Sequence, residues 1–129
     1  MVVVDTSAWI EYFRDGNPAT VAKVDRCLER DLIVMGVLIY CEVVQGIRRQ
    51  RERNEILNLF SALPRYDMLG FHIAGIAAEN YRKMRSNGIT IRKTIDVIIG
   101  TFCAEHGFEL VHFDRDFDFM APHIGLRAI

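Results

Sequence analysis

The sequence has 129 residues, half of them hydrophobic and about a quarter charged, and its formal net charge is −1. This length and composition predict one globular domain spanning residues 1–129, and the near-neutral charge argues against a protein that simply coats nucleic acid. No apolar run approaches the ~20 residues of a membrane span, so we expect no membrane association. The three cysteines are odd in number and lack metal-type spacing, which favours a reduced, cytoplasmic location.

The first half of the chain alternates predicted strands and helices. Val2–Val4 is a β-branched run that suits a buried strand, and a helix is expected over residues 7–13. Pro18 ends a turn and suits the first position of a second helix. A second strand is expected at residues 32–35, followed by a helix that runs from about Leu38 into a group of arginines.

The second half continues this alternation. Apolar residues at helical spacing before Pro64 predict one helix, and two more are expected over residues 72–85 and 95–105. Strands are expected at residues 110–113 and 126–129. Strands separated by helices predict an α/β fold, namely a three-layer α/β/α sandwich with a mainly parallel central sheet. In such a sheet, functional groups gather at the carboxyl ends of the strands.

Two aspartates stand where predicted strands end. Asp5 follows the first strand directly, and Asp114 follows a later strand in the stretch VHFDRDFDF. If the sheet is parallel, both carboxylates project from the same edge. Taken alone, Asp5 is better explained as the N-cap of the helix that follows it, and only the pattern of four acids favours a ligand.

Two further acids lie inside apolar stretches, Glu42 in VLIYCEVVQGI and Asp96 in TIDVIIGTF. A buried carboxylate is costly unless it is paired or bound to a metal, so an arginine partner and a cation are the two alternatives. Gly46 and Gly100 each follow one of these acids by four residues and share its helical face. They leave room for a ligand, or they serve helix packing.

Four converging carboxylates would repel one another, and some would stay protonated near neutral pH. A divalent cation removes this repulsion. A set of oxygen ligands without cysteine or histidine favours Mg²⁺ or Mn²⁺ over Zn²⁺. Such an ion lowers the pKa of a bound water, which is the chemistry of phosphodiester hydrolysis.

Four stretches of the chain together resemble a PIN domain, and more narrowly the VapC-type toxins of bacterial toxin–antitoxin pairs. They are VVVDTSAW, YCEVVQG, RKTIDVIIGTFCAEHG and HFDRDFDFMA, and the resemblance covers essentially the whole chain. It implies a small Mg²⁺- or Mn²⁺-dependent ribonuclease that is silenced by a cognate antitoxin and is usually a homodimer.

The resemblance also implies roles for the four acids. Asp5, Glu42, Asp96 and Asp114 are the catalytic quartet, and the three aspartates hold one or two metal ions. Glu42 completes the metal shell or deprotonates the attacking water, a role that suits its longer side chain.

Three further residues are expected to support this site. Thr6 supplies a hydroxyl. Asp116 lies on the same predicted loop as Asp114 but is assigned a supporting role, with Asp114 preferred as the direct ligand. His112 stands where many relatives have threonine or serine, and it either hydrogen-bonds Asp114 or a water, or fills space.

Basic residues close to the acids are candidates for RNA binding. Arg49 lies seven residues past Glu42, and Arg92 and Lys93 precede Asp96 by about one helical turn. Cations beside a metal site would neutralise RNA phosphates. An acidic stretch of the antitoxin, or plain solvation of a helix face, explains them too.

Two other functions remain as alternatives. The first is a catalytically inert PIN-like module that binds nucleic acid or protein. The second is a phosphatase with an aspartyl nucleophile, which usually has a second aspartate two residues after the first; position 7 is a serine.

Overall fold

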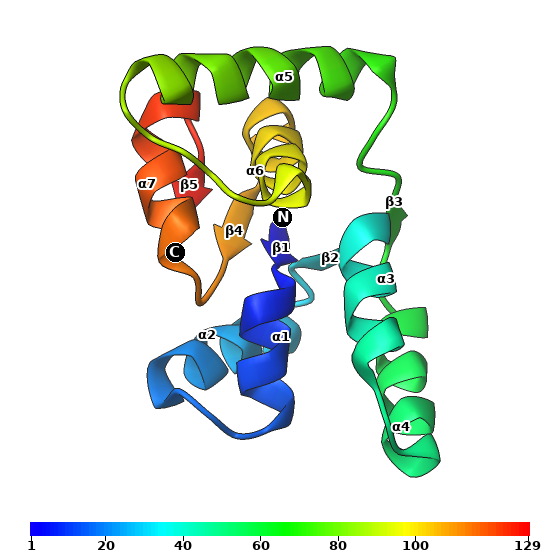
Figure 1. Cartoon of the computed structure of the whole chain (residues 1–129). Helices are drawn as coiled ribbons and strands as arrows, with labels where there is room; N and C mark the ends of the chain where they lie inside the picture. Colours follow the sequence, from blue (N-terminus) through cyan, green and yellow to red (C-terminus); the bar gives the residue numbers. More distant parts are fainter.

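The computed structural model describes all 129 residues and contains a five-stranded sheet (Figure 1). Every strand pairing is parallel, and the strand order is β3-β2-β1-β4-β5. The strands are β1 Val2–Val4, β2 Ile33–Gly36, β3 Arg65–Tyr66, β4 Glu109–Val111 and β5 Arg127–Ala128. The predicted mainly parallel sheet is therefore confirmed, and it is parallel throughout.

Seven helices connect the strands and cover the sheet. They are α1 Thr6–Phe13, α2 Pro18–Glu29, α3 Val37–Gly46, α4 Gln50–Ser61, α5 Phe71–Ser86, α6 Thr94–His106 and α7 Arg115–Ile124. Helix α1 packs on α2 and α3, whereas α5, α6 and α7 pack on one another, with α5 lying across the other two in Figure 1. Right-handed crossovers place these two groups on opposite faces of the sheet, which gives the three predicted layers. No helix has the length and apolar character needed to cross a membrane.

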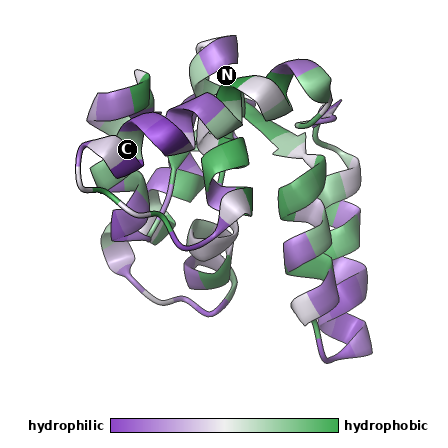
Figure 2. Ribbon diagram, turned by 45° about the horizontal axis from the view of Figure 1, so that its top comes forward, coloured by the Kyte–Doolittle hydropathy of each residue, from purple (hydrophilic) through white to green (hydrophobic).

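The core forms around β1, whose three valines are buried. Trp9 of α1 is fully buried and stacks on Phe13 at a ring-centroid distance of 5.4 Å, with Phe60 of α4 at 5.1 Å. Figure 2 shows hydrophobic colouring on the strand beneath the N-terminal label and hydrophilic colouring at the far end of the α3–α4 pair. The single tryptophan thus joins two helices on one face of the sheet.

The strand order reverses between β1 and β4, and this reversal positions the site. The chain leaves β1 toward β2 on one side and later returns to β4 on the other. In open parallel sheets, the crevice outside such a switch point is where ligands bind. Asp5 follows β1, and Asp114 lies three residues beyond the end of β4.

Helix α7 and strand β3 are not anticipated by the sequence reasoning. The segment expected to be a loop around Asp114 and Asp116 is the start of α7, which tolerates Pro122 within it. Phe117 and Met120 are buried at helical spacing and hold this helix against the core. Strand β3 has only two residues, too few to produce an alternating pattern.

Candidate metal centre

Asp5 is both a helix cap and an acid with an unused oxygen. It is the N-cap of α1, and its Oδ2 accepts hydrogen bonds from the Ser7 N–H at 2.9 Å and the Ser7 hydroxyl at 2.6 Å. Its Oδ1 is buried without a partner. Burial raises the pKa of this carboxyl, while the bonds from Ser7 oppose the rise. Capping of α1 therefore explains one oxygen and leaves the other for a ligand.

Ser7 is a site residue that the sequence reasoning missed. Its Oγ also accepts a hydrogen bond from the backbone N–H of Phe113 at 3.0 Å. One hydroxyl thus joins the end of β1 to the loop between β4 and α7 and fixes the orientation of Asp5. The available signal was a serine two residues after a strand-ending aspartate, a spacing that allows a local side-chain bond.

Asp96 lies in the first turn of α6 and is the most perturbed acid of the site. It is 5% exposed, and its Oδ2 has no hydrogen-bond partner. Burial raises the pKa of Asp96 to about 7, and the negative charge of Asp5 adds to the rise. The Lys93 ammonium opposes it, while the charges of Asp114 and Glu42 contribute further. The other three predicted acids therefore lie close enough for their charges to disfavour ionisation of Asp96.

Both acids of the Asp-Arg-Asp stretch reach the site. Asp114 is the N-cap of α7, and its Oδ1 accepts a hydrogen bond from the Asp116 N–H at 2.9 Å. One carboxylate oxygen from each of Asp96, Asp114 and Asp116 lies within 4.8 Å of the others. Because residues 114 and 116 occupy a helix start and not an open loop, Asp116 is placed beside Asp114 as a candidate ligand.

Glu42 of α3 and Thr6 of α1 form one side of the site. The Thr6 hydroxyl donates a hydrogen bond to Glu42 Oε1 at 2.9 Å, linking α1 to α3. Neither Glu42 nor Asp96 forms a salt bridge with an arginine. The alternative of a buried ion pair is therefore not what the structure contains.

His112 supports the backbone of Asp114 and does not contact its carboxylate. Its Nδ1 accepts the Asp114 N–H at 3.1 Å, and its Nε2 lies 3.2 Å from Asp118 Oδ1. A ring that accepts at Nδ1 and donates from Nε2 serves both contacts in one tautomer. Asp118, interpreted from the sequence as a turn residue, is instead a helical residue that pairs with this histidine.

A divalent cation fits these residues. Two buried carboxylate oxygens, Asp5 Oδ1 and Asp96 Oδ2, lack any partner, and an unpaired buried charge is expensive. The donor set consists of carboxylates alone, which matches hard ions such as Mg²⁺ and Mn²⁺. The carboxylates close enough to share one ion are those of Asp96, Asp114 and Asp116, and the predicted ligand Asp5 is not among them. A cation there would offset the burial and the neighbouring negative charges that raise the pKa of Asp96.

The two glycines near the acids have different surroundings. A Cβ at Gly100 would lie 2.4 Å from Met120 Sδ of α7, so this glycine serves helix packing. A Cβ at Gly46 would meet nothing within 4 Å, and this glycine borders an open groove. Only Gly46 leaves room for a ligand.

The predicted basic residues lie around the site but not in the expected register. Helix α3 ends at Gly46 and Arg49 is the N-cap of α4, so the expectation of one continuous helical face with Glu42 is wrong. Arg49 and Glu42 nevertheless line the same groove, of about 530 Å³, between α1, α3 and α4. Arg92 and Lys93 are exposed just before α6.

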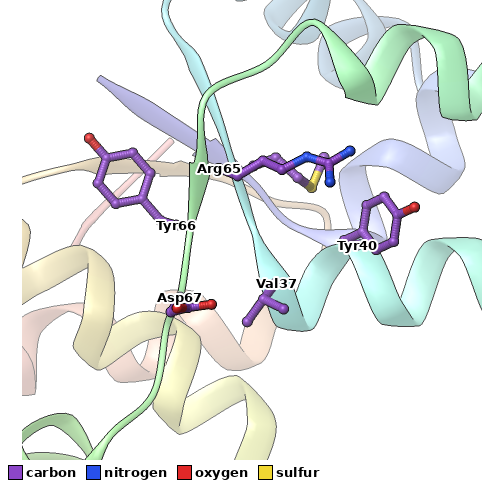
Figure 3. A pocket seen from close by; sticks show the side chains of 6 residues that line it. Val37, Tyr40, Arg65, Tyr66 and Asp67 are labelled. Atoms are coloured by element: carbon purple, nitrogen blue, oxygen red, sulfur yellow. The ribbon is translucent and has the colours of Figure 1, made fainter.

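Two other hollows flank the sheet. One of about 500 Å³ lies between the start of α2 and the loop that carries Asp114, so it adjoins the acidic site. The other, of about 410 Å³, lies by β3 at one edge of the sheet (Figure 3). There the Arg65 side chain extends toward Tyr40 and lies 5.3 Å from its ring centroid, while Tyr66 points to the opposite side of the strand. Asp67 is its only acid, so this hollow does not extend the metal centre.

Comparison with known proteins extends the similarity beyond the acids. Residues 2–121 match the family described as the PIN domain. VapC ribonuclease Mb1587 of Mycobacterium bovis and ribonuclease VapC11 of Mycobacterium tuberculosis are each 32% identical over 130 residues, 99% of this chain and 97% of the relative.

Solved structures share the fold. VapBC2 of Rickettsia felis, bound to a DNA fragment from its promoter, aligns with a TM-score of 0.75 at 14% identity, covering 100% of this chain and 98% of that chain. FitAcB of Neisseria gonorrhoeae aligns with a TM-score of 0.71 at 19% identity, covering 100% and 96%. The similarity thus spans the whole architecture.

Proposed function

The chain belongs to the PIN-domain family, with VapC-type toxins as its relatives, and on that premise we propose that it is a Mg²⁺- or Mn²⁺-dependent endoribonuclease. It acts in the cytoplasm, as a single domain of residues 1–129, and is the toxin of a toxin–antitoxin pair. The observation that carries the proposal is the carboxylate cluster of Asp96, Asp114 and Asp116, with the unpartnered Oδ2 of Asp96 within it.

In this proposal Asp5, Asp96 and Asp114 hold the cation, and Asp116 is a neighbouring ligand or supports Asp114. A bound Mg²⁺ or Mn²⁺ lowers the pKa of a water and neutralises charge on the phosphate oxygens. Ser7 and the two helix N-termini keep the aspartates in place before the substrate arrives.

Glu42 is the residue proposed to accept the proton of the attacking water. The hydrogen bond from Thr6 fixes Glu42 Oε1 and thereby orients the carboxylate. The water oxygen bonds to phosphorus while the bond from phosphorus to the 3′ oxygen breaks, and that oxygen takes up a proton. The products are a 5′-phosphate and a 3′-hydroxyl. Arg49, Arg92 and Lys93 neutralise neighbouring RNA phosphates.

We propose that the cognate antitoxin occupies the groove between α1, α3 and α4. Its floor is apolar, and its rim carries three arginines beside Glu42 and Glu52. The apolar residues are Ile10, Phe13, Val43, Ile47 and Ile56, and the arginines are Arg48, Arg49 and Arg14, which pairs with Glu11. An apolar segment with acidic neighbours fits such a groove. Because Arg49 is proposed to bind RNA as well, an antitoxin seated here silences the enzyme by competing for the same cations.

A second copy of the chain is proposed to cover α5 and α6. Phe71 is fully exposed, and it shares a helical face with Ala74 and Ala78, which line an apolar hollow of about 450 Å³. Insertion of each Phe71 into the partner's hollow makes a self-complementary homodimer contact. Phe71→Glu should shift the dimer to monomer in light scattering, and a dimer that persists contradicts this interface.

The experiment that tests the proposed function is cleavage of a total-RNA pool by the purified, antitoxin-free protein. We expect discrete fragments in Mg²⁺ or Mn²⁺, no fragments with chelator, and none from Asp96→Asn. Asp67→Asn, an exposed aspartate at the β3 edge, is the matched control and should cleave normally.

Two outcomes would contradict the proposal. Cleavage that persists in Asp96→Asn would remove the acidic cluster from the mechanism. No cleavage, together with no rise in melting temperature on adding Mn²⁺, would favour the inert binding module.

A further inference from the structure

The hollow of about 500 Å³ beside Asp114 contains an exposed aromatic ring. Phe113 is 49% exposed, although it lies between His112 and Asp114 in the loop from β4 to α7. The wall opposite is the start of α2, including Thr20 and Lys23, and the two segments lie near each other in Figure 1. An apolar ring therefore lies in solvent next to a proposed metal ligand.

The backbone that carries this ring is held on both sides. The Phe113 N–H donates to Ser7 Oγ at 3.0 Å, and the Asp114 N–H donates to His112 Nδ1 at 3.1 Å. Burial of the aromatic ring itself does not explain this arrangement, because half of it is accessible. The backbone that carries the ring is thus held in place, and the ring lines a hollow together with Asp114.

Two cations border the same hollow. Lys23 approaches from α2, and Arg115 is the first residue of α7. Neither forms a salt bridge, whereas Asp118, which also lines the hollow, is paired with His112. Two unpaired cations beside an aromatic ring match the backbone and the base of a single-stranded nucleotide.

We propose that this hollow is a nucleotide subsite, in which the Phe113 ring stacks on an unpaired RNA base next to the scissile phosphate. Lys23 and Arg115 neutralise the phosphate on that side of the cleaved bond. The inference rests on the proposed ribonuclease function and adds a substrate requirement to it: the nucleotide at this position must be unpaired, and its stacking strength biases the choice of cleavage position.

The test is cleavage of a random-sequence single-stranded RNA pool in Mn²⁺, with the cut positions read by sequencing. Phe113→Ala should lower the cleavage rate by about tenfold, the loss expected for one base-stacking contact, and should change the base preference beside the cut. Phe113→Trp should retain both rate and preference, and Phe113→Leu should resemble alanine because it keeps apolar volume without a ring. Phe119→Ala removes an aromatic ring of similar exposure outside this hollow and should cleave normally.

Lys23→Gln separates the phosphate contact from the base contact. It should weaken cleavage for all sequences alike and reduce the dependence of RNA binding on salt. If wild-type protein cleaves RNA and Phe113→Ala cleaves the same positions at the same rate, the subsite is refuted and the proposed ribonuclease function stands. Equal activity of Phe113→Leu and wild type would also overturn the subsite, because stacking would not be required. Wild-type protein that does not cleave would instead refute the proposed function.

Discussion

Replacing Asp96 by asparagine should stabilise the metal-free protein while abolishing its chemistry. The carboxyl is 5% exposed, and its pKa rises from the ordinary value of 3.8 to about 7. A pKa change of one corresponds to about 1.4 kcal/mol, so ionised Asp96 costs the folded state about 4 kcal/mol. The buried amide of asparagine forfeits about 1–2 kcal/mol of this gain because it lacks partners. A net stabilisation of about 2–3 kcal/mol is expected at pH 8.

The advantage of Asp96→Asn depends on pH in a defined direction. Below about pH 4, the Asp96 carboxyl is largely protonated in the folded and the unfolded chain, and its ionisation contributes little. Between pH 4 and 7 the unfolded chain loses this proton while the folded protein keeps it, so wild-type stability falls as pH rises. Above pH 7 the full penalty applies. The difference between variant and wild type should therefore grow from pH 4 to pH 8.

Urea denaturation in chelator at several pH values measures this difference, with Asp67→Asn as a control that should stay within about 0.5 kcal/mol of wild type. Adding Mn²⁺ at 1,000 times its dissociation constant should reverse the order, because a ligand that binds only the folded state then stabilises wild type by about 4.1 kcal/mol. An Asp96→Asn variant that is less stable than wild type at pH 8 in chelator would refute the reasoning that the acids repel.

Three further predictions follow from the packing. Ser7→Ala should cost about 0.5–1.5 kcal/mol in urea denaturation because it removes two hydrogen bonds, although Asp5 Oδ2 keeps the backbone N–H of residue 7. Ser86→Ala on the surface should cost under about 0.5 kcal/mol. Gly100→Ala should destabilise by about 1–3 kcal/mol through overpacking, whereas Gly75→Ala, with open space around its Cβ, should stabilise its helix by about 0.5–1 kcal/mol. Cys41 is the exposed cysteine, so native protein should react rapidly with about one equivalent of a thiol reagent and denatured protein with three.

The elements with a strong apolar period could be predicted from the sequence. The valine run of β1, the helix of residues 7–13 and the helix that carries Asp96 all appear within one or two residues of the expected bounds. The β-branched run of β1 favours a strand, and the apolar residues at helical spacing in the other two segments favour a helix. Helix α7 could not be predicted in this way because its acids and Pro122 resemble a turn, and its stability comes from burying Phe117 and Met120.

That acids gather at this edge of the sheet could be predicted in part, because a carboxylate inside an apolar stretch stands out in the sequence. Asp96 stands among apolar residues and is buried, where a carboxylate needs a compensating partner, whereas Glu42 stands in a similar stretch but is only half-buried. The hydrogen bond between His112 and Asp114 is one of the predicted alternatives and is confirmed, although it goes to the backbone of Asp114. The role of Ser7 was not predicted, since it depends on a contact between the end of β1 and the loop after β4. Arg49 and Glu42 line the same groove although the helix breaks between them. The helical spacing therefore predicted their proximity for a reason that the structure does not support.

The chemical identity of the RNA ends tests the central claim most directly. Attack by an external water on phosphorus, with departure of the 3′ oxygen, predicts fragments that carry a 5′-phosphate and a 3′-hydroxyl. Ligation of adapters that require these ends, before and after phosphatase or kinase treatment, reads them out. Fragments with 5′-hydroxyl and 2′,3′-cyclic phosphate ends would show that the RNA's own 2′-hydroxyl is the nucleophile, and would contradict the account.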